Sequence, residues 1–183
     1  MTLPAATILT ARLRLRPLVA EDADEMVAVL KDPRMHEFTG GQPLGLDDLR
    51  ERYRRLTVGH SADGTEQWFN WIVRFSADDQ AVGVMQATVT DDGSTADVAW
   101  EVGVPWHGQG IASEAAAGMI EWLVGHGVGT ISACIHPDHQ ASARIASRVG
   151  FVATTETTDG EVVWRRLRPM ETPADRGGCG SRR

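Results

Sequence analysis

The chain has 183 residues, and 42% of them are hydrophobic, which suits one domain with a single hydrophobic core. Its formal net charge of −7 argues against general binding to nucleic acid or to an anionic membrane, because both need a surplus of positive charge. Two cysteines do not make a disulfide framework, and the sequence contains neither a secretory signal pattern nor a run of about 18 apolar residues, so a cytoplasmic protein is expected.

The first third of the chain predicts one strand and two helices. Apolar and charged residues alternate over 13–18, as in a half-buried strand, and residues 1–10 lead into it. A helix is expected to open at Glu21, because acidic residues favour the positive end of a helix, and to stop at Asp32-Pro33. A second helix is expected over 47–58, after a loop rich in Gly, Pro and Thr.

Three strands joined by short turns follow. Residues 67–75 and 81–90 are rich in strand-forming residues and flank the polar turn 76–80, which predicts a hairpin. The turn 91–94 then leads into a strand over 96–102. Consecutive strands with such short connections predict an antiparallel meander.

The second half of the chain predicts a strand–helix–strand unit. Apolar residues recur at helical spacing from Ile111 to about His126, and a short apolar strand is expected over 130–135. A connection of this length favours parallel pairing between the strands 96–102 and 130–135. A last helix is expected over 140–149.

A closing hairpin completes the predicted fold. Its strands are expected over 151–157 and 161–167, on either side of Asp159-Gly160. The predicted class is α+β, with a mixed, mostly antiparallel sheet of six to seven strands, one parallel pair and about four helices. One domain is expected over 9–170, and the polar tail 171–183, rich in Gly and Arg, is expected to be disordered.

A turn that contains two glycines joins the strand 96–102 to the helix that begins at Ile111. Gly108 and Gly110 let the backbone approach a ligand, because no Cβ stands in the way. The first amides of the following helix are unpaired, and the positive end of its dipole faces the turn. These features predict a phosphate site, although an ordinary tight turn has the same pattern.

Three local motifs carry a family resemblance. They run from Leu9 to Leu18 with Glu21-Asp22-Ala23 after it, from Trp106 to Ala115, and from Pro137 to Ser142 with Gly150-Phe151 beyond it. With the order of elements, they resemble the GNAT superfamily of acetyl-coenzyme A (acetyl-CoA)-dependent N-acetyltransferases. Within it they resemble the RimJ/RimL-type branch, which includes ribosomal-protein acetyltransferases. The resemblance covers most of residues 9–167.

The resemblance implies acetyl-CoA as co-substrate and an amine as acceptor, either a protein N-terminus or a small molecule. Amides of the glycine loop would bind the pyrophosphate. A break at Gly103-Val104-Pro105 would splay the fourth predicted strand from the fifth and free strand amides for the pantetheine arm and the thioester carbonyl. The candidate acetyl-CoA residues are Val102, Val104, His107, Gly108, Gln109, Gly110, Ile111, Ala112, His139 and Arg144. Arg144 and Arg148 would reach the 3′-phosphate or form a solvated helix face.

Three residues are candidates for proton transfer. Asp97 and Glu101 share one face of the strand 96–102, where either could take the amine proton, directly or through water, or simply belong to a solvated face. Glu101 is nearer the strand break. Ser142 could protonate the leaving thiolate or cap the helix 140–149.

One departure from the superfamily pattern keeps a second hypothesis open. The helix position that often holds a tyrosine general acid is Ala146 here, and the only tyrosine is Tyr53, so a non-catalytic acyl-CoA-binding or sensor module is the alternative. A Rossmann-type enzyme is disfavoured, because the glycine turn follows a meander. No metal site is expected, because His136 and His139 have no third ligand at a matching spacing. The sequence leaves the oligomeric state open, with a homodimer among the alternatives.

Overall fold

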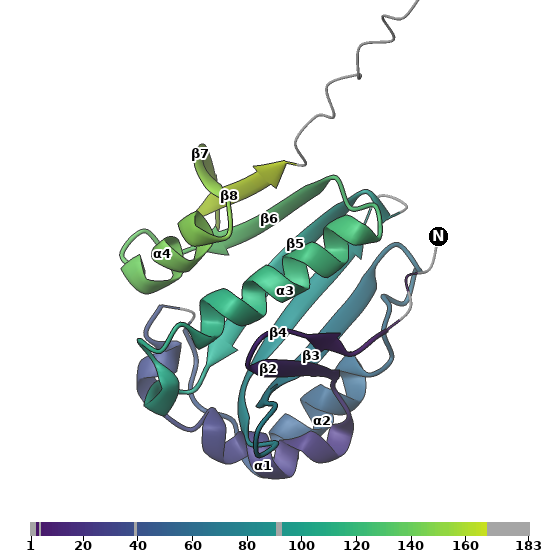
Figure 1. The fold of residues 1–183 in the computed structure, drawn as a ribbon, viewed down its shortest axis with the longest axis vertical. Coiled ribbons are helices and arrows are strands. Elements are labelled where there is room, and N and C mark those ends of the chain that lie inside the picture. The colour runs from purple at the N-terminus through teal and green to yellow at the C-terminus, as the bar shows by residue number, and fades with distance from the viewer. Residues whose placement is uncertain (1–2, 4, 39, 91–92, 168–183) are drawn as a thin grey trace, which may run out of the picture.

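A mixed sheet forms the framework of the domain. In the computed structural model, which describes residues 3, 5–38, 40–90 and 93–167, its strands are β1 (Ile8–Leu9), β2 (Leu13–Pro17), β3 (Gln67–Phe75), β4 (Ala81–Thr90), β5 (Thr95–Val102), β6 (Thr130–Ile135), β7 (Val152–Thr158) and β8 (Glu161–Leu167). Their order in the sheet is β1-β2-β3-β4-β5-β6-β8-β7 (Figure 1). Among these strands β5 and β6 pair in parallel, and the other neighbours are antiparallel. The predicted α+β class and its parallel pair are confirmed.

The described part of the sheet has eight strands, against the six to seven expected. The difference is β1, which lies in the segment expected only to lead into the sheet and pairs Ile8 with Leu15. A strand of two residues is too short to show a period of two, so sequence alternation does not detect it. Residues 91 and 92 of the expected turn 91–94, and the tail 171–183, lie outside the described residues.

The helices are α1 (Ala23–Val29), α2 (Leu46–Leu56), α3 (Ile111–Gly125) and α4 (Gln140–Arg148), and short 3-10 turns cover Ala20–Asp22, Pro33–His36 and Val104–Trp106. The last three helices end one or two residues before their expected limits. In α2 the reason is local, since the Thr57 hydroxyl donates to the Arg54 carbonyl at 2.8 Å and ends the helix there. No described helix is both long and apolar enough to cross a membrane.

The first helix begins two residues later than its acidic start predicts. The Asp22 carboxylate accepts a hydrogen bond from the Val19 amide at 2.8 Å and pairs with Arg16 on β2. These contacts hold Ala20–Asp22 in a 3-10 turn that precedes α1. The Asp22 carboxylate therefore binds groups that precede the helix. Helical periodicity in the sequence does not reveal its contact with Arg16, so the later start of α1 was not predicted.

Helices cover both faces of the sheet. On β3, Trp71 and Val73 belong to the core that includes α3, whereas Ile72 belongs to the core that includes α1 and α2. Neighbouring strand residues point to opposite faces, so the two cores lie on opposite sides of the sheet. Figure 1 shows α3 lying across the centre of one face, with α4 beside it near β6.

The strands β5 and β6 separate after a short parallel ladder. Their paired residues run from Thr95 with Thr130 to Asp97 with Ser132, although β5 continues to Val102 and β6 to Ile135. The facing edges of 98–102 and 133–135 therefore lie outside this ladder. The predicted splay of the parallel pair is confirmed, but it begins at residue 98, before the break at Gly103-Val104-Pro105 to which it was attributed. Backbone groups that lose strand partners need others when buried, so this gap suits a ligand that supplies hydrogen bonds.

Gly83 is expected to tolerate no side chain. It lies opposite Val102 in the β4–β5 ladder, and a Cβ there would come within 2.3 Å of the Glu101 carbonyl oxygen. Because backbone atoms cannot yield cheaply, Gly83→Ala should lower the free energy of unfolding by about 1–3 kcal/mol, measured by urea denaturation. Gly125→Ala is the matched control, since a Cβ at Gly125 in α3 meets nothing within 4 Å and alanine favours a helix. Equal stability of the two variants would contradict the prediction.

Candidate active site

The loop before α3 adopts a conformation that requires glycine. Gly108 and Gly110 have φ angles of +76° and +78°, in the left-handed region that side chains disfavour. A Cβ at Gly108 would meet nothing within 4 Å, so backbone conformation, and not space, sets the requirement. Gly110 is the N-cap of α3, and its carbonyl accepts from the Glu114 amide at 3.0 Å. The amides of Ile111 and Ala112 therefore have no partner within the helix.

These amides continue a row of donors that begins in the loop. Among the described residues, no backbone oxygen accepts a hydrogen bond from the amides of Gly108, Gln109 or Gly110. The positive end of the 15-residue helix α3 lies behind them. A row of amides at a helix N-terminus is suited to a pyrophosphate.

His107 differs from the other predicted members of this row. Its amide donates to the Val104 carbonyl at 3.1 Å, and its ring Nε2 lies 2.7 Å from the Val102 carbonyl oxygen. Its amide is therefore already used, so the row of free amides begins at Gly108, and a contact between His107 and acetyl-CoA stays a prediction. The ring instead ties the loop to the end of β5.

The Arg12 side chain links the glycine loop to the first turn of α3. Its Nε donates to the Glu114 carboxylate at 2.7 Å, and its terminal nitrogens donate to the Gln109 carbonyl at 3.3 Å. The same carboxylate accepts from the Thr10 hydroxyl at 2.6 Å and the Arg12 amide at 2.8 Å. Burial raises the pKa of Glu114, but these bonds outweigh burial and lower it, so the carboxylate stays ionised. Sequence reasoning missed this role, because Arg12 and Glu114 are 102 positions apart.

The end of β5 presents an amide to the gap beside β6. The Gly103 amide donates to Val82 on β4 at 2.9 Å, so in an alternating antiparallel ladder the amide and carbonyl of Val102 point away from β4. His107 takes the Val102 carbonyl, which leaves the Val102 N–H facing the gap. The Val104 amide, at the start of a 3-10 turn, also finds no backbone acceptor among the described residues. Both positions are compatible with the predicted contacts to pantetheine and thioester.

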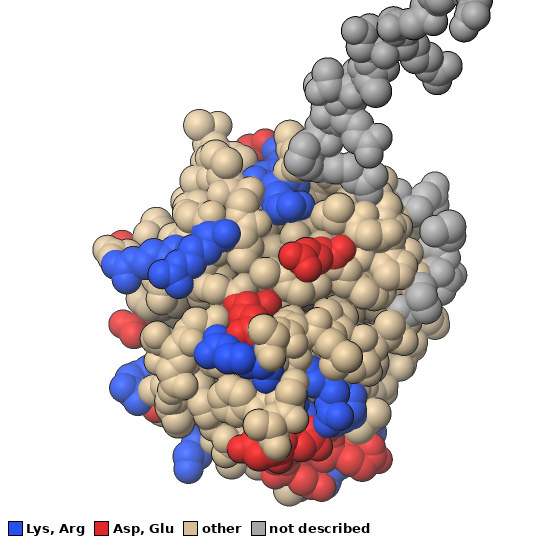
Figure 2. Space-filling model, in the orientation of Figure 1, with Lys and Arg blue, Asp and Glu red and all other residues tan. Residues whose placement is uncertain are grey.

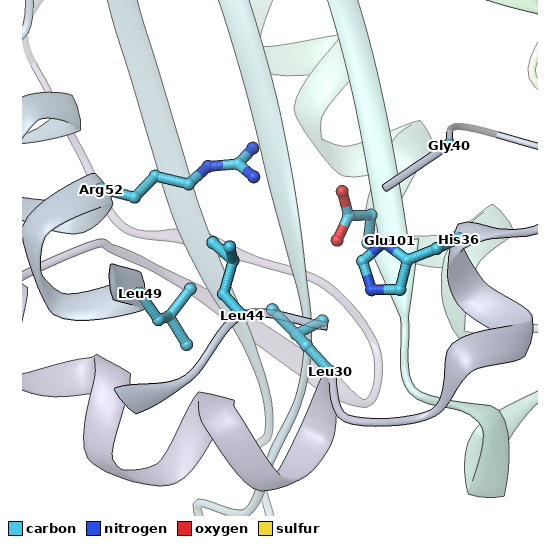
Figure 3. Close-up of a pocket in the computed structure, with 7 residues that line it drawn as sticks. All are labelled: Leu30, His36, Gly40, Leu44, Leu49, Arg52 and Glu101. Carbon is cyan, nitrogen blue, oxygen red and sulfur yellow. The ribbon is translucent and has the colours of Figure 1, made fainter. Parts of the chain in front are cut away.

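A cavity of about 260 Å³ lies beside β5 on the face of the sheet that packs against α1 and α2. It is lined by Leu30, His36, Gly40, Leu44, Leu49, Arg52 and Glu101. Figure 3 shows Glu101 projecting from β5 beside the ring of His36, while Arg52 reaches in from α2 on the opposite side. The structure thus brings Glu101 to a pocket, as expected of a proton acceptor. His36 and Arg52 were not predicted, since helical spacing alone does not show which side chains face β5.

Asp97 lies outside this cavity. It shares the strand face of Glu101 but sits where β5 still pairs with β6, opposite Ser132, and its side chain is exposed. Although the residue as a whole is exposed, partial desolvation of its carboxylate raises the pKa of Asp97, the charge of Glu66 raises it further, and Arg165 opposes both. The structure therefore separates the two carboxylates that share this face.

Ser142 lies on the side of the sheet occupied by α3 and α4. Its hydroxyl accepts from the Trp100 indole N–H at 3.4 Å. The N-cap of α4 is His139, without a side-chain cap, so the capping role considered for Ser142 does not match its position inside the helix.

Ala146 is fully buried in the core. The Tyr53 hydroxyl is buried in the core with α1 and has no hydrogen-bond partner among the described residues. Burial is the main cause that raises the pKa of Tyr53, and the negative charge of Glu101 raises it further.

The loop before α4 packs on an aromatic ring. The rings of His139 and Phe38 stack at 4.5 Å between centroids, and burial lowers the pKa of His139, which favours its neutral form. No group of three or more His, Cys, Asp or Glu side chains in the described part of the chain could hold a metal ion. Arg144 is exposed and bonds to Gln140 at 3.2 Å. Figure 2 shows basic side chains gathered over α4 and acidic ones over α1.

Comparisons with known proteins agree on one family. The family model described as acetyltransferase (GNAT) domain matches residues 12–152. A curated relative, the uncharacterized N-acetyltransferase p20 of Bacillus licheniformis, is 24% identical over 148 residues, which cover 79% of this chain and 82% of the relative.

Solved structures have the same fold. RimL, the ribosomal L7/L12 α-N-protein acetyltransferase solved with coenzyme A, has a TM-score of 0.74 at 17% identity and covers 88% of this chain and 98% of its own. An acetyltransferase from Agrobacterium tumefaciens has a TM-score of 0.70 at 20% identity, with 92% and 98% covered. The aminoglycoside acetyltransferase AAC(6′)-Ib with coenzyme A has a TM-score of 0.69 at 18% identity, with 85% and 95% covered.

The RimL neighbour is consistent with the RimJ/RimL-type motifs of the sequence. The family match begins at Arg12, next to β2, and includes the glycine loop. The chain belongs to the GNAT family of acetyl-CoA-dependent N-acetyltransferases.

Proposed function

We propose that this acetyltransferase transfers the acetyl group to a primary amine that enters the cavity beside Glu101, by direct attack in a ternary complex. One observation carries the proposal. Glu101 and Val102 are neighbours on β5, and the carboxylate of the first faces the cavity while the amide of the second faces the gap beside β6. A thioester in the gap would therefore meet an amine from the cavity at this pair.

The donor would lie along the two groups of free amides. The pyrophosphate would bind the amides from Gly108 to Ala112, and the pantetheine arm would run into the gap along β5. There the Val102 N–H would donate to the thioester carbonyl, where negative charge develops during attack. This arrangement uses neutral donors, which suits a chain with a net charge of −7.

Glu101 would accept the proton that the amine must lose, directly or through a water molecule. The amine nitrogen then forms a bond to the acetyl carbon, the carbon–sulfur bond breaks, and the thiolate takes a proton as it leaves. Ser142 is the proposed donor of that proton. Its oxygen already accepts from Trp100, so its own O–H is available.

A covalent acetyl-enzyme is not needed. Cys134 on β6 is the free cysteine of the described residues, and burial, followed by the charges of Glu161 and Asp97, raises its pKa. A raised pKa disfavours the thiolate that would act as nucleophile. The raised pKa of Cys134 therefore favours direct attack by the amine over a mechanism with an acetylated cysteine.

Gly108→Ala should weaken acetyl-CoA binding by about tenfold, measured by isothermal titration, because an alanine in left-handed backbone costs about 1–2 kcal/mol and would distort the amide row. Gly127→Ala is the matched control. Gly127 also has a positive φ, +99°, and open space around it, but it lies beyond the other end of α3. The control should lose stability and keep its affinity, and an equal loss of affinity in both variants would refute the loop assignment.

Glu101→Gln should lower kcat/KM by about 10²-fold or more in a thiol-release assay with a panel of primary amines, because the variant cannot accept a proton. The deficit should shrink at high pH, where more of the amine is already unprotonated. Affinity for acetyl-CoA should not change.

Asp97→Asn is the control for Glu101→Gln, since it removes a carboxylate from the same strand face outside the cavity. A larger loss for Asp97→Asn than for Glu101→Gln would assign the proton acceptor to Asp97. Binding of acetyl-CoA without turnover of any amine would instead support the sensor module.

A further inference from the structure

The Arg52 side chain lines the cavity without an anionic partner. It is half-buried, and it forms no ion pair or hydrogen bond with any described residue. Its neighbours on α2 behave differently, since Arg50 pairs with Asp24 and Asp47, and Arg54 pairs with Glu51. The Arg52 nitrogens do not belong to the buried polar atoms that lack a partner in the described part of the chain, so water reaches this guanidinium. An anion in the cavity would replace that water with charged hydrogen bonds.

The opposite wall of the cavity has the opposite charge. Figure 3 shows the Glu101 carboxylate and the Arg52 guanidinium directed into the same space from β5 and α2. Three apolar side chains, Leu30, Leu44 and Leu49, also line the cavity, and Figure 3 shows them below the two charged groups. The cavity therefore complements a molecule with an amine at one end, an apolar body and an anion at the other end.

The size and charge of the cavity further restrict the chemical class of the acceptor. A volume of about 260 Å³ is below the roughly 300–1,000 Å³ of pockets for drug-sized ligands. A polycation would place positive charge against Arg52, whereas a carboxylate matches the planar fork of a guanidinium.

We propose that the acceptor is a small aminocarboxylate, an amino acid or a similar molecule, whose carboxylate binds Arg52 while its amine lies at Glu101. This inference rests on the proposed function, because it assigns the cavity to the acceptor. Arg52 then determines specificity, and Glu101 acts on the reacting amine.

The test compares matched acceptors and matched variants of the full chain. The acceptors are L-leucine with L-leucinamide, and 6-aminohexanoate with 6-aminohexanamide, so that each pair differs in its carboxylate. The quantity is the acid-to-amide ratio of kcat/KM, taken in Arg52→Gln relative to the unsubstituted protein, which cancels the different reactivities of the amines. Arg55→Gln is the control, since Arg55 is exposed on the same helix and does not line the cavity.

Arg52→Gln should lower kcat/KM for the better carboxylate acceptor by about 10- to 100-fold, mainly through KM, because a charged hydrogen bond is lost. Its activity on the matching amide should change less than about threefold. Arg52→Lys should recover part of the loss, and Arg55→Gln should change neither substrate. Thermal unfolding and acetyl-CoA titration establish that each variant folds and binds the donor.

The outcomes separate this inference from the proposed function. Turnover of amines with an acid-to-amide ratio that Arg52→Gln leaves unchanged would overturn the role of Arg52 and keep the acetyltransferase. No turnover of any amine would count against the proposed function itself. Preference for peptides with acidic N-terminal sequences over both free aminocarboxylates would overturn the small-molecule assignment.

Discussion

The separation of β5 from β6 after three paired positions is the constraint on which the site depends. It leaves one edge of β5 available to a ligand from residue 98 to Val102, where the strand ends. The chain must then cross from β5 to β6, and the connection is α3, so the helix begins next to the open edge. The amides of the glycine loop and the amide of Val102 thereby lie on one continuous stretch of chain, which suits a donor with phosphate at one end and a thioester at the other.

A loop with left-handed glycines and free amides is not stable by itself, and distant residues hold it. The Glu114 carboxylate is partly withdrawn from water, a costly state for a charge unless it is paired and hydrogen-bonded. Thr10 and Arg12 supply those bonds, and Arg12 also reaches the Gln109 carbonyl. Thr10 and Arg12, between β1 and β2, would therefore support the proposed donor site without lining it, which gives a physical reason for the opening motif of the sequence.

Elements with a clear period could be predicted from the sequence, and elements set by distant contacts could not. The meander from β3 to β5 and the helix α3 follow from alternation and helical spacing. The splay was expected from Gly103 and Pro105, but β5 and β6 already separate after Asp97. The strand β1 is too short to have a period, and the start of α1 depends on a contact between Asp22 and Arg16. Glu101 could be selected from strand alternation near the break. Arg52 could not, because its place in the cavity requires that α2 and the end of β5, which are distant in the sequence, border the same space.

The charge of the chain and the charge of its ligands are reconciled locally. A protein with a net charge of −7 repels anions at long range, yet its proposed ligands carry phosphates and a carboxylate. Backbone amides can bind the phosphates, because they donate hydrogen bonds without adding net charge. The carboxylate needs a guanidinium that is not already neutralised, and in α2 the arginines on either side of Arg52 pair with acidic residues while Arg52 does not. Arg55 on the same helix also has no ion pair with a described residue, but it is exposed and does not line the cavity. Selectivity for an anionic acceptor would thus depend less on how many arginines the helix carries than on which unpaired one faces the cavity.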